Sequence, residues 1–191
     1  ETTRELMVKH RMTRNPIHVV LLGTEHPKVA PKRSSAVQRT LVYMGSFMPY
    51  KNVDLLVRSM EHLPGYRLQL MSRVAPAEQA RLEALAPAGS LEFFNGASDE
   101  QYESAMKDAT ALVTASCDEG FGLPVVEAMA LGTPVLISDI PIFREIGRQA
   151  AVFFDPDSVE SVVAGVRQLE DAEEWKRRSA ASVAWAKRYN W

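Results

Sequence analysis

Short apolar runs that alternate with helical patterns are the feature of this sequence that most constrains its fold. The runs are β-branched or aromatic and lack apolar–polar alternation, which is typical of strands buried on both faces. Seven strands are predicted: Ile17–Leu22, Leu41–Met44, Arg67–Met71, Leu91–Phe94, Ala111–Thr114, Pro134–Ile137 and Ala151–Phe154. Because strands alternate with helices, the connections should be right-handed crossovers. The sequence therefore predicts one doubly wound α/β domain with a parallel sheet.

Capping residues place several helix boundaries. Asn52 precedes an apolar pattern of helical spacing and is a good N-cap. Ser98 and Gln101 have the spacing of a capping box. Pro124 suits the first position of a helix, and Gly132 suits the residue after its end. These signals predict helices that begin near residues 52, 98 and 123.

Composition excludes several classes of protein. The 191 residues suit one domain, and 46% hydrophobic with 24% charged residues is typical of a soluble globular chain. We find no apolar run long enough to span a membrane and no signal peptide, and a first residue other than Met suggests a fragment. Cys117 is the one cysteine, and the four histidines lack ligand spacing. We therefore expect neither a disulfide nor a metal site, and a cytoplasmic location.

Charge is unevenly distributed along the chain. Residues 1–39 carry eight Lys/Arg against three Asp/Glu, although the net charge is −2. A solvated basic segment explains this surplus. The alternative is a contact with a phosphate-rich cleft, a partner domain or an anionic membrane surface. We expect no nucleic-acid partner, because no nucleic-acid-binding signature accompanies the charge.

The strand predicted at Ala111–Thr114 leads into a glycine-containing turn. Ligands of an open parallel sheet bind outside the carboxyl ends of its strands. Gly120 and Gly122 allow a close backbone approach. A helix that starts near Leu123 points free N–H groups and its positive dipole end at the same place, which suits a phosphate. Glu119 precedes this helix and should reach into the same crevice.

Glu127 lies about one turn inside that helix, among apolar residues. A carboxylate is costly to bury there unless it is hydrogen-bonded, and sugar or ribose hydroxyls are suitable donors. The alternative is that Glu127 faces water, and the sequence alone favours neither.

Lys51 stands between a turn at 45–50 and the helix predicted from Asn52. A cation beside a helix N-terminus is electrostatically misplaced unless an anion lies between them. We therefore favour a phosphate ligand over a solvated lysine.

The stretch 119–135 reads Glu-Gly-Phe-Gly-Leu-Pro-Val-Val-Glu-Ala-Met-Ala-Leu-Gly-Thr-Pro-Val. It resembles the large retaining glycosyltransferase family of GT-B fold often called family 4. The similarity continues through residues 45–52, 94–100, 136–141, 144–147 and 154–156. The resemblance implies a Rossmann-like domain that forms the C-terminal, nucleotide-sugar-binding half of such an enzyme.

The resemblance also implies roles for individual residues. The donor sugar would face four successive residues: Glu119, Gly120, Phe121 and Gly122. Glu119 is the expected catalytic residue, and Glu127 would bind the ribose. The base would lie near Gly96 and Ala97.

For the diphosphate, the resemblance implies contacts with Lys51 and the backbone of Leu123. Ser46 stands where many members carry an arginine, so one expected phosphate cation is missing. Arg73 replaces part of a glycine-rich turn and is a further candidate for the diphosphate. No metal is expected, because cations and the helix dipole would stabilise the leaving group.

By the same resemblance, residues 1–15 are the hinge or the end of an N-terminal domain, and 16–191 form the donor-binding domain. The N-terminal acceptor domain is then absent from this chain, which alone should not transfer efficiently. The expected reaction moves a hexose, with retention, to a carbohydrate, lipid-linked or small-molecule acceptor. Peripheral association with the inner face of the membrane fits this function. Two alternatives remain: a nucleotide-sugar epimerase and a non-catalytic nucleotide-sugar-binding module.

Overall fold

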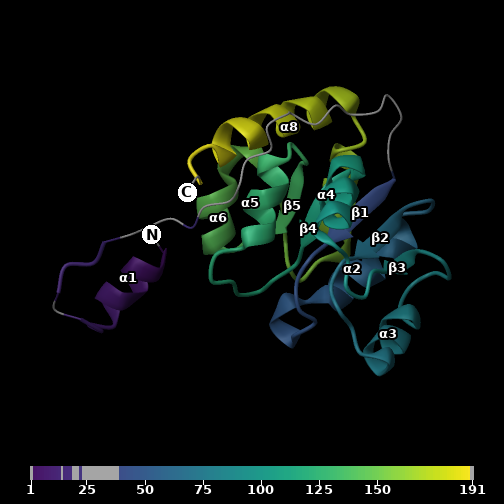
Figure 1. Ribbon diagram of the computed structural model, residues 1–191, viewed down its shortest axis with the longest axis horizontal. Helices are drawn as coiled ribbons and strands as arrows, with labels where there is room; N and C mark the ends of the chain where they lie inside the picture. Colours follow the sequence, from purple (N-terminus) through teal and green to yellow (C-terminus); the bar gives the residue numbers. More distant parts are fainter. Residues whose placement is uncertain (1, 14, 19–21, 23–38, 190–191) are drawn as a thin grey trace.

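The computed structural model describes residues 2–13, 15–18, 22 and 39–189. In these residues the strands form one six-stranded sheet of order β3-β2-β1-β4-β5-β6, and every neighbouring pair is parallel (Figure 1). The strands are β1 (Thr40–Tyr43), β2 (Arg67–Leu70), β3 (Leu91–Phe93), β4 (Ala111–Thr114), β5 (Val135–Ser138) and β6 (Val152–Phe154). The predicted doubly wound α/β architecture is confirmed.

Six of the seven predicted strands are present, each within one residue of its predicted ends. The seventh, Ile17–Leu22, includes residues 19–21, which lie outside the described part of the chain. Strand β1 pairs with both β2 and β4, and Leu41 lies opposite Ala111. Because β1 and β4 are adjacent but not consecutive, the winding of the sheet reverses between them. This is the switch point at which such sheets bind ligands.

Helices cover both faces of the sheet (Figure 1). One face packs against α2 (Val53–Ser59), α3 (Pro76–Glu83) and α7 (Val159–Gln168). The other packs against α4 (Asp99–Asp108), α5 (Leu123–Ala130), α6 (Pro141–Gly147) and α8 (Ala172–Ala186). Short 3₁₀ turns are η1 (Pro49–Lys51), η2 (Met60–His62) and η3 (Arg148–Ala150), and α1 (Thr2–Lys9) lies beside α6.

In the central strands β1, β4 and β5, side chains alternate between the two faces, and nearly all are buried. Tyr43 packs into the core under α2, whereas its neighbour Val42 packs into the core under α5, and both are fully buried. Burying an aliphatic or aromatic side chain of this size contributes roughly 1.5–3 kcal/mol. The two-sided burial explains why these three strands lack polar alternation, whereas β2 (Arg67–Leu70) alternates and is buried on one face.

The capping predictions are confirmed except for the role of the Asn52 side chain. Ser98 and Gln101 form the capping box of α4. Pro124 lies in the first turn of α5, and Gly132, with φ +75°, follows its end. Asn52 occupies the N-cap position of α2 as predicted, but its side chain does not cap the helix. It adopts a left-handed conformation (φ 50°), where 3₁₀ turn η1 ends, and makes no side-chain cap. Its amide instead donates to the Pro156 carbonyl at 2.8 Å.

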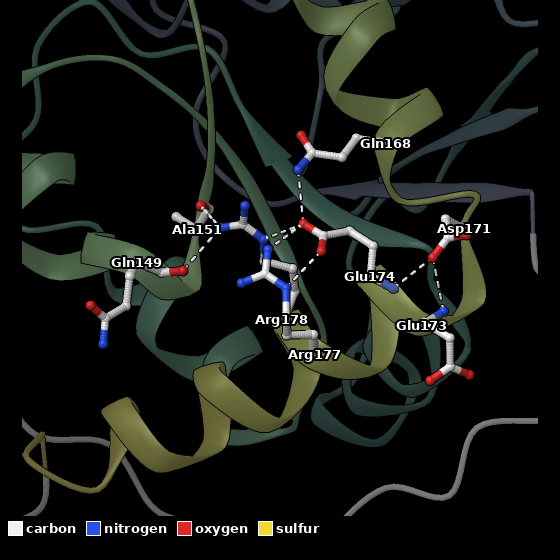
Figure 2. Close-up of polar contacts among 8 residues, drawn as sticks. All are labelled: Gln149, Ala151, Gln168, Asp171, Glu173, Glu174, Arg177 and Arg178. Carbon is white, nitrogen blue, oxygen red and sulfur yellow. Dashed lines mark hydrogen bonds and ion pairs between the residues drawn. The ribbon is translucent and has the colours of Figure 1, made fainter.

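A network of polar and charged side chains joins α8 to the end of α7 and to the segment just before β6 (Figure 2). The Glu174 carboxylate accepts hydrogen bonds from Gln168, Arg177 and Arg178 at 2.7–2.8 Å. Arg178 also donates to the Ala151 carbonyl at 2.5 Å. The two guanidinium groups lower the pKa of Glu174 to about 2. Because α8 packs on α5, this network supports the helix whose first turn borders the candidate site.

Candidate functional site

A cavity of about 510 Å³ opens at the carboxyl ends of β1 and β4. Gly45 and Lys51 line it from the segment after β1. From the segment after β4, Glu119 and residues 120–123 line it. The cavity therefore lies at the switch point of the sheet, where the sequence predicted a site.

Backbone contacts hold the loops around this cavity together. The Cys117 N–H donates to the Tyr50 carbonyl at 2.8 Å, which joins the loops after β4 and β1. The Gly45 N–H donates to the Ser72 hydroxyl at 3.0 Å, which joins the loops after β1 and β2. A Cβ at Gly45 would lie 2.9 Å from the Tyr43 hydroxyl, so a side chain does not fit there.

Lys51 and Glu119 form an ion pair in which the ammonium donates to the carboxylate. The side chains are only 14% and 18% exposed, respectively. The other oxygen of Glu119 accepts from the Gly120 N–H at 3.2 Å. Lys51 also lies 5.2 Å from the centroid of the Tyr50 ring. In this structure, Glu119 is therefore the anion beside Lys51.

The first turn of α5 borders the cavity. Gly122 precedes it with φ +88°, and a Cβ there would lie 2.9 Å from Cε1 of Phe143. Only glycine meets both conditions. Leu123 begins the helix, and it lines the cavity together with Pro124 and Val125, so the positive end of the helix dipole borders the cavity. This end of α5 suits an anionic group.

Glu127 lies one turn further along α5 and is half-buried. The Tyr102 hydroxyl on α4 donates to its Oε2 at 3.0 Å. Burial and the Glu127 charge raise the pKa of Tyr102 far above its usual value, so the hydroxyl stays protonated. Glu127 is not among the residues that line the cavity. Sequence reasoning missed Tyr102, because nothing in residues 98–109 indicates a contact with α5.

The remaining predicted residues lie around the cavity rather than in its lining. The Arg73 guanidinium lies along Gly96, where an added Cβ would be 3.6 Å from Nε. Arg73 therefore accompanies the predicted base segment rather than Lys51. Ala97 packs against the core under α4 and α5. Ser46 is exposed, and its carbonyl accepts from the Tyr43 hydroxyl at 2.6 Å.

Two further observations concern the described residues only. They contain no group of three His, Cys, Asp or Glu side chains arranged to hold a metal ion. None of their helices is long and apolar enough to cross a bilayer.

Comparison with known proteins gives a consistent result. The family model described as "Glycosyl transferases group 1" matches residues 27–184. The chain is 32% identical over 136 residues to O-antigen chain mannosyltransferase RfbU of Salmonella typhimurium, covering 68% of this chain and 38% of that protein. It is 28% identical over 187 residues to a GDP-mannose:cellobiosyl-diphosphopolyprenol alpha-mannosyltransferase of Xanthomonas oryzae, covering 92% and 49%. The chain thus spans less than half the length of these relatives.

Solved structures share the fold. A sucrose-phosphate synthase from Thermosynechococcus elongatus superposes with a TM-score of 0.79 at 21% identity, covering 100% of this chain and 53% of that one. The lipopolysaccharide outer core galactosyltransferase WaaB, in its apo form, gives a TM-score of 0.79 at 20% identity, covering 98% and 55%. In each case this chain matches about half of the longer protein.

Proposed function

We propose, because this chain belongs to the glycosyl transferases group 1 family, that it binds the nucleotide-sugar donor of a hexosyl transfer. It would act as the donor-binding half of a longer enzyme whose acceptor domain lies outside this chain. The observation that carries the proposal is the cavity shared by Lys51, Glu119 and the first turn of α5. A cation and a helix N-terminus on one cavity are suited to a diphosphate.

The diphosphate is assigned to Lys51 and the backbone at Leu123. In the free domain Lys51 is paired with Glu119, so a diphosphate must share or replace that partner. Ser46 supplies a hydroxyl in place of a cation. Arg73, whose guanidinium lies along Gly96, is a further candidate for the diphosphate. Developing charge on the leaving diphosphate is then stabilised by Lys51 and the α5 dipole, without a metal.

The donor sugar is assigned to Glu119 and residues 120–122. As the diphosphate leaves, positive charge develops at the anomeric carbon. The Glu119 carboxylate is suited to orient sugar hydroxyls and to stabilise that charge, which makes it the proposed catalytic residue of a retaining transfer. Glu127 is assigned to the ribose, and the base to the segment around Gly96 and Ala97.

GDP-mannose is the first donor to test. Several similar proteins are named mannosyltransferases, and the name of one group specifies GDP-mannose and a polyprenol-linked acceptor. A lipid-linked acceptor would bring the full-length enzyme to the inner face of a membrane.

A donor-turnover assay on the full-length protein tests this function. A transferase releases GDP from GDP-mannose when acceptor or water takes the sugar, and Glu119→Ala should slow this release strongly. A nucleotide-sugar epimerase would change the sugar without releasing GDP. A non-catalytic binding module, which the missing arginine at Ser46 favours, would bind GDP-mannose but leave it intact. Either outcome would replace the proposed transferase.

A further inference from the structure

We propose that Tyr102 is a positioning residue: its hydroxyl holds one oxygen of Glu127, so that the other meets the ribose hydroxyls of the donor. This inference rests on the proposed function, in which Glu127 binds the ribose. It adds a residue outside the 119–135 motif to the recognition of the nucleotide.

The geometry joins two helices that are distant in the sequence. Tyr102 lies in the first half of α4 and Glu127 in α5, and the two helices cover the same face of the sheet (Figure 1). The hydroxyl oxygen of Tyr102 lies 3.0 Å from Glu127 Oε2. Of the residues that the structure describes, only Tyr102 donates a hydrogen bond to this carboxylate.

The Glu127 carboxylate can accept a hydrogen bond from Tyr102 on one oxygen and further hydrogen bonds from a ligand on the other. An ionised carboxylate only accepts hydrogen bonds, and its two oxygens offer about four acceptor positions. The phenol occupies a position on Oε2. Oε1 remains for the 2′- and 3′-hydroxyls of a ribose, which can both donate. Because the half-buried Tyr102 ring packs against the core under α5, its hydroxyl offers a fixed partner rather than a mobile one.

Fixing the carboxylate in advance favours binding. A glutamate side chain that is free to change rotamer loses conformational freedom when a ligand orders it. Tyr102 removes that cost before the nucleotide arrives. This gain in binding free energy applies only to the ligand hydroxyls that contact Glu127. It should therefore appear as a preference for ribose over deoxyribose.

Calorimetry with ribo- and deoxyribonucleotides tests this role on the 191-residue chain. GDP and 2′-deoxy-GDP are titrated into wild type, Tyr102→Phe and Tyr66→Phe. The last variant is a matched control, because the Tyr66 hydroxyl also donates to a carboxylate, that of Glu170 at 3.2 Å, away from the cavity. We expect wild type to bind GDP more tightly than 2′-deoxy-GDP. In Tyr102→Phe the ratio of these two affinities should be about fivefold smaller. Tyr66→Phe should keep it.

A purely structural role for Tyr102 predicts a different result. Loss of packing or stability would weaken GDP and 2′-deoxy-GDP equally, and equal weakening would overturn the proposal. An unchanged preference in Tyr102→Phe would also overturn it.

A double-mutant cycle supplies a second test. Glu127→Gln should reduce the ribose preference, and adding Tyr102→Phe to it should reduce the preference little further. Additive losses would contradict a role through Glu127. If wild type binds no nucleoside diphosphate at all, the proposed function is contradicted. The role of Tyr102 in ribose recognition is then contradicted with it. If wild type prefers GDP and Tyr102→Phe keeps the same preference, only the role of Tyr102 is contradicted, and the proposed nucleotide site stands.

Discussion

The Lys51 ammonium is hydrogen-bonded to the Glu119 carboxylate, although 68 positions separate the two residues in the chain. The pair joins the segment after β1 to the segment after β4 across the switch point of the sheet. It places the residue proposed to bind phosphate in contact with the residue proposed to act on the sugar. Both are mostly shielded from water, so their charges interact more strongly than a surface pair would.

This pairing predicts that Glu119→Gln strengthens the binding of a nucleoside diphosphate without sugar. The substitution removes a negative charge that repels the diphosphate and competes for Lys51. We expect GDP affinity for the 191-residue chain to rise by about three- to tenfold, measured by calorimetry. Asp118→Asn is a suitable control, because Asp118 is an exposed neighbour that does not line the cavity. Equal gains in both variants would indicate a general charge effect, and a loss in Glu119→Gln would contradict competition for Lys51.

In the full-length enzyme, the two glutamates should differ in their kinetic effects. A ribose contact is equal in the ground and transition states, so Glu127→Ala should mainly raise the KM for the donor. Glu119→Ala should mainly lower kcat, because its charge acts as the bond to the diphosphate breaks. Steady-state kinetics with GDP-mannose measures both. If Glu119→Ala kept the wild-type kcat with only a raised KM, Glu119 would be a binding residue.

Gly122→Ala should destabilise the domain and distort the first turn of α5. The variant combines an unfavourable positive φ with a Cβ only 2.9 Å from Phe143, and we expect a loss of about 2–4 kcal/mol in the free energy of unfolding. Gly89→Ala separates the two effects: Gly89 has φ +76° but no atom within 4 Å of the added Cβ. Backbone strain alone should then cost about 1 kcal/mol. Urea denaturation of both variants checks the difference, and equal losses would exclude the clash.

Acid should weaken the network around α8. Arg177 and Arg178 lower the pKa of Glu174 from 4.5 to about 2 in the folded protein. Since the folded pKa lies below the unfolded one, this stabilisation is complete above about pH 4.5 and is lost as the pH falls toward 2. We expect Glu174→Gln to lower the unfolding free energy at pH 7 by about 1–2 kcal/mol, discounted for the exposure of Arg177.

Denaturation at several pH values measures this effect. The difference between wild type and Glu174→Gln should shrink between pH 4.5 and pH 2.5. Glu173→Gln is the control, because Glu173 is 82% exposed in its pair with Lys176 and should contribute little. A pH-independent difference would mean that the Glu174 effect arises from packing rather than charge.

Much of the fold was predictable because its signals are local. Strands buried on both faces produce short apolar runs, and these runs located β1 to β6. The capping box of Ser98 and Gln101 depends on residues three positions apart, so it was visible in the sequence. Gly122 and Gly132 flank α5 and have positive φ, which glycine adopts readily at the ends of a helix.

The parts that sequence reasoning missed depend on tertiary contacts. Asn52 has the side chain of an N-cap, but the loop after β6 binds its amide at Pro156. The sequence indicated an anion beside Lys51, but it gave no sign that Glu119 pairs with this lysine in the folded chain. Tyr102 contacts Glu127 only because α4 and α5 cover the same face of the sheet. None of these contacts has a fixed spacing in the sequence.

The most direct test of the central claim is a calorimetric titration of GDP into wild type and Lys51→Ala. Wild type should bind in the micromolar to millimolar range, about −4 to −8 kcal/mol, because the chain spans less than half the length of its relatives and would supply only the donor side of a cleft. Lys51→Ala should bind about tenfold more weakly, since a charge-assisted contact is lost. Lys107→Ala, which removes an exposed lysine paired with Glu103, should bind like wild type. Absence of heat with millimolar GDP, UDP and ADP, or equal binding by Lys51→Ala and wild type, would contradict a nucleotide-sugar site at this cavity.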